Sequence, residues 1–548
     1  MILWTILNIF LLVAIVSAEF CKSLDFLKAI IGAESDTPIM INCYVEKELE
    51  GFDYLKKFTK EVEEHNDKTI RDGEEAIRQL ISAFLLNTEM ITMIMRSNSA
   101  DAVICNVTLQ RAKNRIDYPT KEDLSGAAIG LLRLQDTYQM DTKDIADGKI
   151  LNSQTRTVAL TAGDCFEIGR VAYNKHDYYH TIMWMQEARE RVEKEAVRSA
   201  NLDDILEYLA FSLYKQGNLK RALLLADELY RMNPDHPRAR SNVRKYEYLL
   251  ENNGVQRIDM RGDIPPINNI RDENEFDEGA KLTYEALCRQ KVPVDTTAQS
   301  RLYCYYKMDR PYLNLAPFKV EIVRQNPLVV LFSDIVSDNE ARIIQMLAAS
   351  KAYLMLHVFV LYASLKWTEH EIVKRIDRRL ELATNLEIET AENLQIHNYG
   401  IGGYFIPHLD CEWISKGNQH FKKLETGNRI ASVLIYMTEP EIGGRTVFMT
   451  NLKISVPCIK NAALFWYNLM RNGEIDVRSR HAACPVLTGS KWIMTKQFRE
   501  RGQEWRRPCG LNQFDQERYI GDLGAHKPKY HPNIKSKANS PKKLHENH

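Results

Sequence analysis

The spacing of apolar residues changes once along this 548-residue chain, and the change limits the folds that the chain can adopt. Early segments such as 52–62 place apolar residues every three or four positions, as on one face of an amphipathic helix. After Pro265 and Pro266, short apolar runs such as 430–436 are separated by turn residues, as in β-strands. The chain is therefore predicted to be a multidomain α+β protein, helical first and sheet-rich afterwards.

Residues 150–250 show the pattern of helix-turn-helix repeats. Ala210, Ala222 and Ala226 fall where a tetratricopeptide repeat requires small residues, and Pro234 falls where such a repeat closes. Small residues at these positions let two helices of a repeat approach each other closely. This part of the chain is predicted to form a tetratricopeptide-like α-helical domain.

Tyrosines are concentrated in these repeats. Flat rings stack well on a polyproline II helix, so a tyrosine-lined concave face would suit an extended proline-rich peptide. The alternative interpretation is that the rings only pack helices together. The tyrosines are Tyr173, Tyr178, Tyr179, Tyr208, Tyr214 and Tyr230.

The N-terminus indicates the compartment. Residues 1–18 are almost entirely apolar and end in the small residues Ser17 and Ala18, which is typical of a secretory signal peptide. A membrane anchor is the alternative interpretation of the same run. The sequon at Asn106 predicts N-glycosylation and agrees with passage through the secretory pathway. The formal net charge is zero, because 73 Lys and Arg residues balance 73 Asp and Glu residues, which argues against binding of nucleic acids.

Composition and periodicity divide the chain into six segments. The N-terminal helices are of a kind that packs against a second copy, although an ordinary helical bundle fits the same pattern. The stretch after the repeats has the Pro-Pro and Asn-Gly signals of a linker, and the polar C-terminal tail is predicted to be disordered. The segments are a signal peptide (1–18), a helical N-terminal dimerisation domain (19–145), the tetratricopeptide-like peptide-substrate-binding domain (146–251), a linker (252–282), a catalytic domain (283–509) and a disordered tail (510–548).

His408 and Asp410 form a His-x-Asp motif. On a strand, residues i and i+2 share a face, so the imidazole and the carboxylate supply two of the three ligands of a facial triad for non-haem iron(II). His481 is the candidate third ligand, because a barrel brings distant strands together, although an ordinary buried or surface histidine is the alternative. Lys491 follows ten residues later, where its ammonium group could pair with the distal carboxylate of a dicarboxylate cosubstrate.

From Leu394 to Cys509 the sequence resembles the catalytic domain of the alpha subunit of collagen prolyl 4-hydroxylase. The resemblance extends upstream through 132–138 and 177–181, so that it covers nearly the whole chain apart from the tail. The matching runs are NYG at 398–400, PH at 407–408, GNRIA at 427–431, FWYNL at 465–469, HAACPVL at 481–487 and ERGQE at 500–504.

The resemblance implies a double-stranded β-helix (jelly-roll) domain that uses iron(II), 2-oxoglutarate, oxygen and L-ascorbate. The product would be 4-hydroxyproline in X-Pro-Gly sequences of procollagen. By match, His408, Asp410 and His481 hold the iron. Lys491 binds the distal carboxylate of 2-oxoglutarate. The other residues implied are Tyr399 and Tyr436 beside the cosubstrate, and Tyr179, Tyr208, Phe211, Tyr214, Arg238 and Asn242 in the peptide-binding domain.

The same resemblance bears on the cysteines and on the partner. The chain has ten cysteines and no CxxC motif, and the resemblance implies the disulfides Cys288–Cys304 and Cys484–Cys509. The other six cysteines remain unassigned. Members of the family assemble as an alpha2beta2 tetramer with protein disulfide isomerase as the beta subunit, which retains them in the lumen of the endoplasmic reticulum.

One segment departs from the family pattern. Within 348–368 an apolar stretch replaces a polar one, through a real change or an error in the gene model, and Phe405 and Ile406 stand where the family has a Tyr-Glu pair. Two further interpretations therefore stand beside the first. One is a peptide-binding or assembly subunit with weak or no catalysis, and the other is a prolyl hydroxylase of a non-collagen secreted protein.

Overall fold

The computed structural model describes residues 121–151, 158–271, 279–293, 296–351, 353–355, 360–412, 426–450 and 452–512, together with isolated positions at 56, 60, 84, 85 and 88. Almost all of them belong to one compact unit, residues 77–548. The predicted signal peptide, Asn106, most of the predicted 19–145 domain and nearly all of the predicted tail lie outside the described residues.

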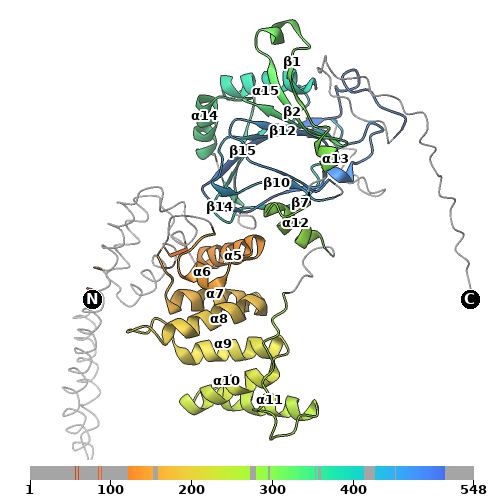
Figure 1. The fold of residues 1–548 in the computed structure, drawn as a ribbon. Helices are drawn as coiled ribbons and strands as arrows, with labels where there is room; N and C mark the ends of the chain where they lie inside the picture. Colours follow the sequence, from red (N-terminus) through yellow and green to blue (C-terminus); the bar gives the residue numbers. More distant parts are fainter. Residues whose placement is uncertain are drawn as a thin grey trace, which may run out of the picture. The chain divides into compact units, whose positions relative to one another are not determined.

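The N-terminal half of the described chain is helical (Figure 1). The helices α7 to α11 pack each against the next, as helical repeats do. The helices are α5 (Lys121–Tyr138), α6 (Thr142–Ala146), α7 (Ala162–Asn174), α8 (Tyr178–Val192), α9 (Leu202–Lys215), α10 (Leu219–Met232) and α11 (Ala239–Asn252).

Local sequence signals set where these helices begin. Thr161 and Asp164 form a capping box at the start of α7, in which each side chain accepts the other residue's backbone N–H. Asp177 caps α8 and Asn201 caps α9 through the same kind of side-chain acceptor. The small residues expected of a tetratricopeptide repeat are fully or almost fully buried between helices, which confirms the repeat-like domain.

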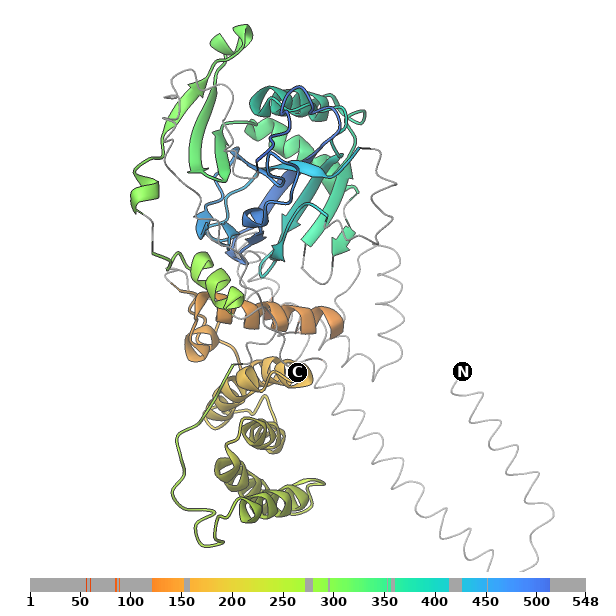
Figure 2. The same ribbon diagram turned by 90° about the vertical axis from the view of Figure 1, so that its right-hand side faces the viewer.

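The chain after α11, residues 253–271, runs as an extended strap along the ends of the repeat helices (Figure 2). The Asn218 side chain makes two hydrogen bonds with the backbone of the strap. It donates to the carbonyl of Asn268 at 2.6 Å and accepts from the N–H of Asn268 at 2.7 Å. Arg221 donates to the carbonyl of Pro265 at 3.0 Å. Helix α12 (Ala280–Cys288) then begins inside the range predicted as linker. The described part of the predicted linker is thus bound to the repeats.

The C-terminal half contains two antiparallel sheets and a short two-stranded one. The nine-stranded sheet has the order β1-β2-β3-β12-β8-β15-β6-β5-β4, the four-stranded sheet β11-β10-β13-β7, and the pair β14-β9 lies beside them. The strands of the larger sheet are β1 (Cys304–Lys307), β2 (Phe318–Gln325), β3 (Leu328–Ser333), β4 (Tyr353–Met355), β5 (Val360–Leu365), β6 (Leu394–Tyr399), β8 (Arg429–Tyr436), β12 (Ala463–Tyr467) and β15 (Lys491–Arg499).

The smaller sheet faces the larger one across a shared apolar core. Its strands are β7 (Phe405–His408), β10 (Thr446–Phe448), β11 (Ile454–Val456) and β13 (His481–Ala483), and the two-stranded pair is β9 (Ile442–Gly443) with β14 (Val486–Thr488). The remaining elements are α13 (Thr296–Gln299), α14 (Asp338–Ala349), α15 (Glu371–Thr384) and two 3-10 turns, Pro311–Asn314 and Val477–Ser479.

Strand β8 shows why the sequence of a central strand in this half is mostly apolar. Val433 and Ile435 join the cluster under α14 and α15, whereas Leu434 and Tyr436 join the cluster between the two sheets. A strand buried on both faces is a near-continuous apolar run, which in β8 is interrupted by Ser432. The layers, with helices outside a large sheet and a smaller sheet opposite, confirm the predicted α+β class.

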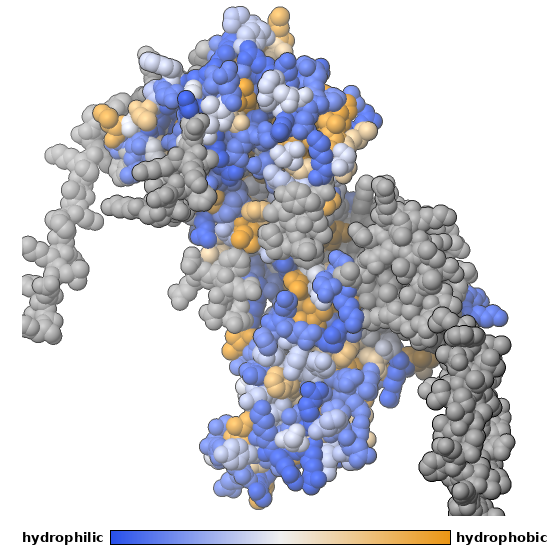
Figure 3. All heavy atoms as spheres, turned by 180° about the vertical axis from the view of Figure 1, so that it is seen from behind, coloured by the Kyte–Doolittle hydropathy of each residue, from blue (hydrophilic) through white to orange (hydrophobic). Residues whose placement is uncertain are grey.

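On the face drawn in Figure 3, the described residues form a mostly hydrophilic surface with separate apolar patches. Among the described residues, no helix is long and apolar enough to cross a membrane. The apolar segment 352–365 instead supplies β4 and β5 at one edge of the larger sheet.

Candidate metal centre and cosubstrate site

Two neighbouring strands of the smaller sheet bring the predicted iron ligands together. His408 at the end of β7 is paired with His481 at the start of β13, and Asp410 follows β7 directly. The donor atoms of these three side chains all lie within 4.8 Å of one another. His408 Nε2 is 3.3 Å from Asp410 Oδ1, and His481 Nε2 is 3.8 Å from Asp410 Oδ2. The structure thus brings the three predicted ligands together in space.

Backbone carbonyls orient both imidazoles. The Nδ1 atom of His408 lies 2.7 Å from the carbonyl oxygen of Ile406, and that of His481 lies 3.0 Å from the carbonyl oxygen of Ser479. A carbonyl only accepts, so each Nδ1 carries the hydrogen and each Nε2 keeps its lone pair. Both lone pairs belong to the nitrogens that face Asp410, which is the arrangement needed for a metal ion.

The charges of the group also suit a metal ion. Burial, and then the neighbouring His408, lower the pKa of His481 to about 4, so this imidazole is neutral at physiological pH. Burial alone would raise the pKa of Asp410, but the His481 and His408 rings and the Ser432 hydroxyl hold it well below its ordinary value. A neutral ring and an ionised carboxylate are the forms that bind metal.

A polar network on the larger sheet fixes Asp410. Ser432 of β8 donates its hydroxyl to Asp410 Oδ2 at 2.6 Å, and Gln497 of β15 donates to the same oxygen at 3.1 Å. Asn468 donates to the Ser432 hydroxyl at 2.8 Å. Such supporting groups orient metal ligands and tune their affinity. The sequence analysis missed them, because the pattern of a strand that is buried on both faces does not show which face points to Asp410.

Lys491 is a buried cation without a hydrogen-bond partner among the described residues. It begins β15 directly opposite Tyr399 of β6, and its Nζ lies 5.1 Å from the Tyr399 ring centroid and 5.8 Å from that of Tyr436. Burial lowers the pKa of Lys491. A buried ammonium that lacks a partner is costly unless a ligand supplies the counter-charge. The site therefore fits a carboxylate.

His397 lies in the same strand as Tyr399 and was not singled out from the sequence. It shares the inner face of β6 with Tyr399, against which its ring is stacked with centroids 6.3 Å apart, and it contacts Tyr362 of β5 at 5.2 Å. Burial lowers the pKa of His397 to about 4. The aromatic wall of the cosubstrate site thus reaches β5, within the segment that departs from the family pattern.

Three of the six predicted peptide-binding residues, Tyr208, Phe211 and Tyr214, lie in one aromatic row on the repeats, together with Tyr173 and Tyr178. Its rings are half-buried, so they pack against each other and still present a face. Arg238 donates to Glu207 at 2.8 Å, and Asn242 lies one turn later on α11. The centroid distances along the row are 4.7 Å for Tyr173–Tyr208, 5.5 Å for Tyr173–Phe211, 6.1 Å for Tyr178–Phe211 and 6.0 Å for Phe211–Tyr214.

Tyr179 does not belong to this row. Its ring packs edge-on against His180 at 4.9 Å, and its carbonyl accepts a hydrogen bond from Asn269 of the strap. Consecutive helical residues point about 100° apart, so the neighbouring Tyr178 occupies the row instead. The structure thus separates Tyr179 from the other predicted peptide-binding residues.

A second group of potential metal ligands lies beside the row. Asp204, Glu207 and His236 bring their donor atoms within 4.8 Å of one another. Glu207 is already paired with Arg238, so this group lacks the free carboxylates that a cation requires.

The structure contradicts both predicted disulfides. Cys288, at the end of α12, is bonded to Cys484, which follows β13, with a Cα–Cα distance of 5.6 Å. Cys304 and Cys509 are exposed free thiols. The predictions Cys288–Cys304 and Cys484–Cys509 are therefore wrong in this structure, because α12 packs beneath the smaller sheet and brings Cys288 to Cys484.

Family models match three regions of the chain. The prolyl 4-hydroxylase alpha-subunit N-terminal region matches residues 23–152, the prolyl 4-hydroxylase peptide-substrate-binding domain matches 162–252, and the 2OG-Fe(II) oxygenase superfamily matches 394–499. All of α7 to α11 lies within the second match, and the metal centre within the third.

Whole-length relatives agree with these matches. The chain is 48% identical over 537 residues to prolyl 4-hydroxylase subunit alpha-1 of Caenorhabditis elegans, covering 94% of this chain and 95% of the relative. It is 43% identical to subunit alpha-2 of the same organism, over 94% and 98% of the two chains. It is 34% identical to the human subunit alpha-1, over 94% of this chain and 100% of the relative.

Proposed function

The chain belongs to the prolyl 4-hydroxylase alpha-subunit family, and from this premise we propose that it hydroxylates proline in X-Pro-Gly repeats of procollagen in the lumen of the endoplasmic reticulum. It is an iron- and 2-oxoglutarate-dependent dioxygenase. The observation that carries the activity is that one site contains both an oriented His-Asp-His group and the buried ammonium of Lys491, which has no hydrogen-bond partner among the described residues.

Each residue has a defined part in the reaction. His408, Asp410 and His481 would hold iron(II), which together with 2-oxoglutarate and oxygen supplies the oxidant for the proline ring. Lys491 binds the distal carboxylate of 2-oxoglutarate and thereby fixes its orientation. Tyr399 and Tyr436 cover Lys491 and exclude water, which strengthens this ion pair.

The repeats would hold the peptide. The half-buried row that includes Tyr208, Phe211 and Tyr214 offers ring faces on which proline residues stack. Arg238, which donates to Glu207, and Asn242, one turn further along α11, would add polar groups to the binding of the peptide. Binding by ring stacking and few charges suits an uncharged Pro- and Gly-rich chain.

The partner and the compartment belong to the same proposal. We infer that the signal peptide at 1–18 directs the chain to the endoplasmic reticulum and that Asn106 is glycosylated there. Protein disulfide isomerase would be the beta subunit of an alpha2beta2 tetramer, and ascorbate the reductant. Support comes from the N-terminal sequence and from the names of the relatives.

The substrate is tested in cells. Deletion of the gene should remove hydroxyproline from X-Pro-Gly sites of collagens, as measured by mass spectrometry of secreted proteins. Loss of hydroxyproline from other secreted proteins, with collagens unchanged, would favour the non-collagen substrate instead. An assembly subunit without catalysis would leave hydroxyproline unchanged when His481→Ala replaces the native chain.

A further inference from the structure

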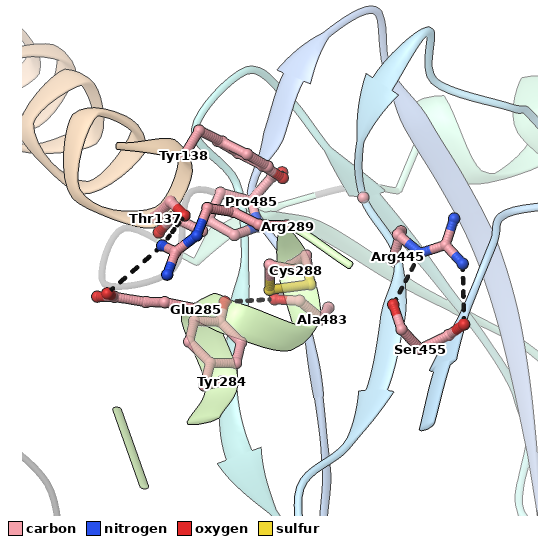
Figure 4. The surroundings of a disulfide bond; sticks show 12 residues. Thr137, Tyr138, Tyr284, Glu285, Cys288, Arg289, Arg445, Ser455, Ala483 and Pro485 are labelled. Atoms are coloured by element: carbon pink, nitrogen blue, oxygen red, sulfur yellow. Dashed lines mark hydrogen bonds and ion pairs between the residues drawn. A yellow bond between two sulfur atoms is a disulfide. The ribbon is translucent and has the colours of Figure 1, made fainter. Parts of the chain in front are cut away.

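Three consecutive residues that follow the iron ligand His481 are each held by a different side chain of the helices next to them (Figure 4). Each contact comes from α5 or α12 and reaches either the last residue of β13 or one of the two residues that lead from β13 to β14. The contacts are the Tyr284 hydroxyl to the Ala483 carbonyl at 3.0 Å, the disulfide of Cys288 with Cys484, and the Tyr138 hydroxyl to the Pro485 carbonyl at 2.6 Å. The strand that carries an iron ligand is thus fixed to two helices outside the sheets.

The two hydroxyl contacts are buried and closely packed. Burial raises the pKa of Tyr138 and of Tyr284, so both remain protonated donors. A Cβ added at Gly443 of β9 would lie 2.7 Å from the Tyr138 hydroxyl, so the position of this hydroxyl is tightly limited. Arg289 of α12 also donates to the carbonyl of Thr137 at 2.7 Å and binds the two helices together.

The other side of α5 and α12 is joined to the repeats by a chain of charges. His180 of α8 lies 2.6 Å from Asp177 through Nδ1 and forms an ion pair with Asp136 of α5, at 3.0 Å, through Nε2. Arg271 lies 2.7 Å from Asp136 and donates to both oxygens of Glu285 of α12, at 3.0 and 2.6 Å. This series of ion pairs therefore connects α8, α5, the strap and α12.

Two members of this series of charges, one on α8 and one on α12, are deeply buried. His180 is 3% exposed and Glu285 is 4% exposed. Burial alone would lower the pKa of His180, but the two carboxylates beside it raise that pKa to about 9, so the ring is charged. Removing one partner from a buried set of charges is costly, which makes the chain a rigid connection rather than a set of surface contacts.

We propose that α5 and α12 form a fixed connection that sets the position of the peptide-binding repeats relative to the iron site, with Arg271 and Tyr138 as positioning residues. The inference rests on the proposed function, because only repeats that hold the substrate need a set distance from the iron. A long peptide bound by the repeats then presents a particular proline to the iron, whereas a short peptide is unaffected by the connection.

Arg271→Gln tests this in the full chain co-expressed with protein disulfide isomerase. We measure kcat/KM for a long (Pro-Pro-Gly)n peptide and for a peptide too short to reach the repeats from the iron site. The ratio of the two values should fall by about threefold or more, within the range for coupling through packed networks, while short-peptide turnover is retained. The matched control is Arg261→Gln, which removes an arginine paired with Asp227 and Glu247 on the repeats, and it should leave the ratio unchanged.

The outcomes separate this inference from the proposed function. An unchanged ratio in Arg271→Gln, or equal losses on both peptides, would overturn the connection. Absence of turnover of either peptide by the native protein would overturn the proposed function instead.

Tyr138→Phe gives an independent measurement that does not depend on replacing a charge. It removes one hydroxyl from a buried ring and keeps the shape. Mass spectrometry of partly reacted long peptides should show that hydroxylation no longer begins at the position favoured by the native protein, while the affinity of the repeats for the peptide is unchanged. The same starting position in both proteins would contradict the proposal.

Discussion

His408 and His481 face each other across the antiparallel pair of β7 and β13, with ring centroids 4.3 Å apart. Asp410 completes the group from the residue pair that follows β7. Because the two imidazoles come from paired strands, the arrangement depends on the register of β7 and β13, whose residues His408 and His481 are 73 positions apart in the sequence. A change in either strand or in the residues that support Asp410 should therefore act on metal binding first.

Ser432→Ala should weaken iron binding. The variant removes the hydroxyl that holds Asp410 Oδ2 at 2.6 Å, and loss of such a supporting group lowers metal affinity by about 10- to 100-fold. Titration of activity with iron(II) measures the change. Ser333→Ala, at the end of β3 in the same sheet, is the control and should bind iron normally. Equal affinities of Ser432→Ala and the native protein would contradict this role.

Lys491→Met should stabilise the protein without ligand and abolish binding of 2-oxoglutarate. The native ammonium is buried with no hydrogen-bond partner among the described residues, so its removal relieves a cost of about 1–3 kcal/mol. Thermal unfolding measures both effects. Saturating 2-oxoglutarate should raise the melting temperature of the iron-loaded native protein, since it binds only the folded state, and should leave that of the variant unchanged. A variant that is still stabilised by 2-oxoglutarate would show that Lys491 is not the binding group.

Because of His180, the free energy of unfolding should fall as the pH becomes alkaline. Its pKa is about 9 in the folded protein and about 6.5 in an unfolded chain, so the protonated ring stabilises the fold fully below about pH 6.5. That contribution, about 3 kcal/mol, is lost as the pH rises through 9. Chemical denaturation between these pH values should show the loss in the native protein and not in His180→Asn. The exposed residue His176 serves as control, and His176→Asn should keep the native pH dependence.

Disulfide mapping should recover a peptide pair that contains Cys288 and Cys484. Digestion without reductant, followed by mass spectrometry, identifies the pair directly. Cys288→Ser should lower the stability by about 2–5 kcal/mol, whereas Cys304→Ser should have little effect because Cys304 is exposed and free. Recovery of Cys288 linked to Cys304 would contradict the observed pairing.

The sequence predicted the metal ligands and Lys491, but not the polar residues that support Asp410. His408 and Asp410 are close in the sequence and stay together in the fold, although β7 ends at His408 and Asp410 lies just beyond the strand on which both were expected. Ser432 and Gln497 were missed because their role depends on which face of two buried strands points to Asp410. An apolar run that is buried on both faces carries no such signal.

The errors have the same origin in three-dimensional packing. Cys288 is close to Cys304 in the sequence, but α12 turns its last residue towards β13 and Cys484. Tyr179 and Tyr178 are adjacent, and only the helical phase decides which ring faces Phe211. Which cysteines pair, and which tyrosine ring faces the row, depend on how helices and strands pack against each other. The amino-acid pattern of a single helix or strand does not contain this information.

The most direct test of the account measures succinate and 4-hydroxyproline together. The full chain, co-expressed with protein disulfide isomerase, is supplied with iron(II), 2-oxoglutarate, ascorbate and a (Pro-Pro-Gly)n peptide. The native protein should form both products in equal amounts, and His481→Ala should reduce both by at least about 100-fold while His176→Ala does not. Product formation by His481→Ala at the native rate, with the variant folded, would contradict the assignment of the metal centre.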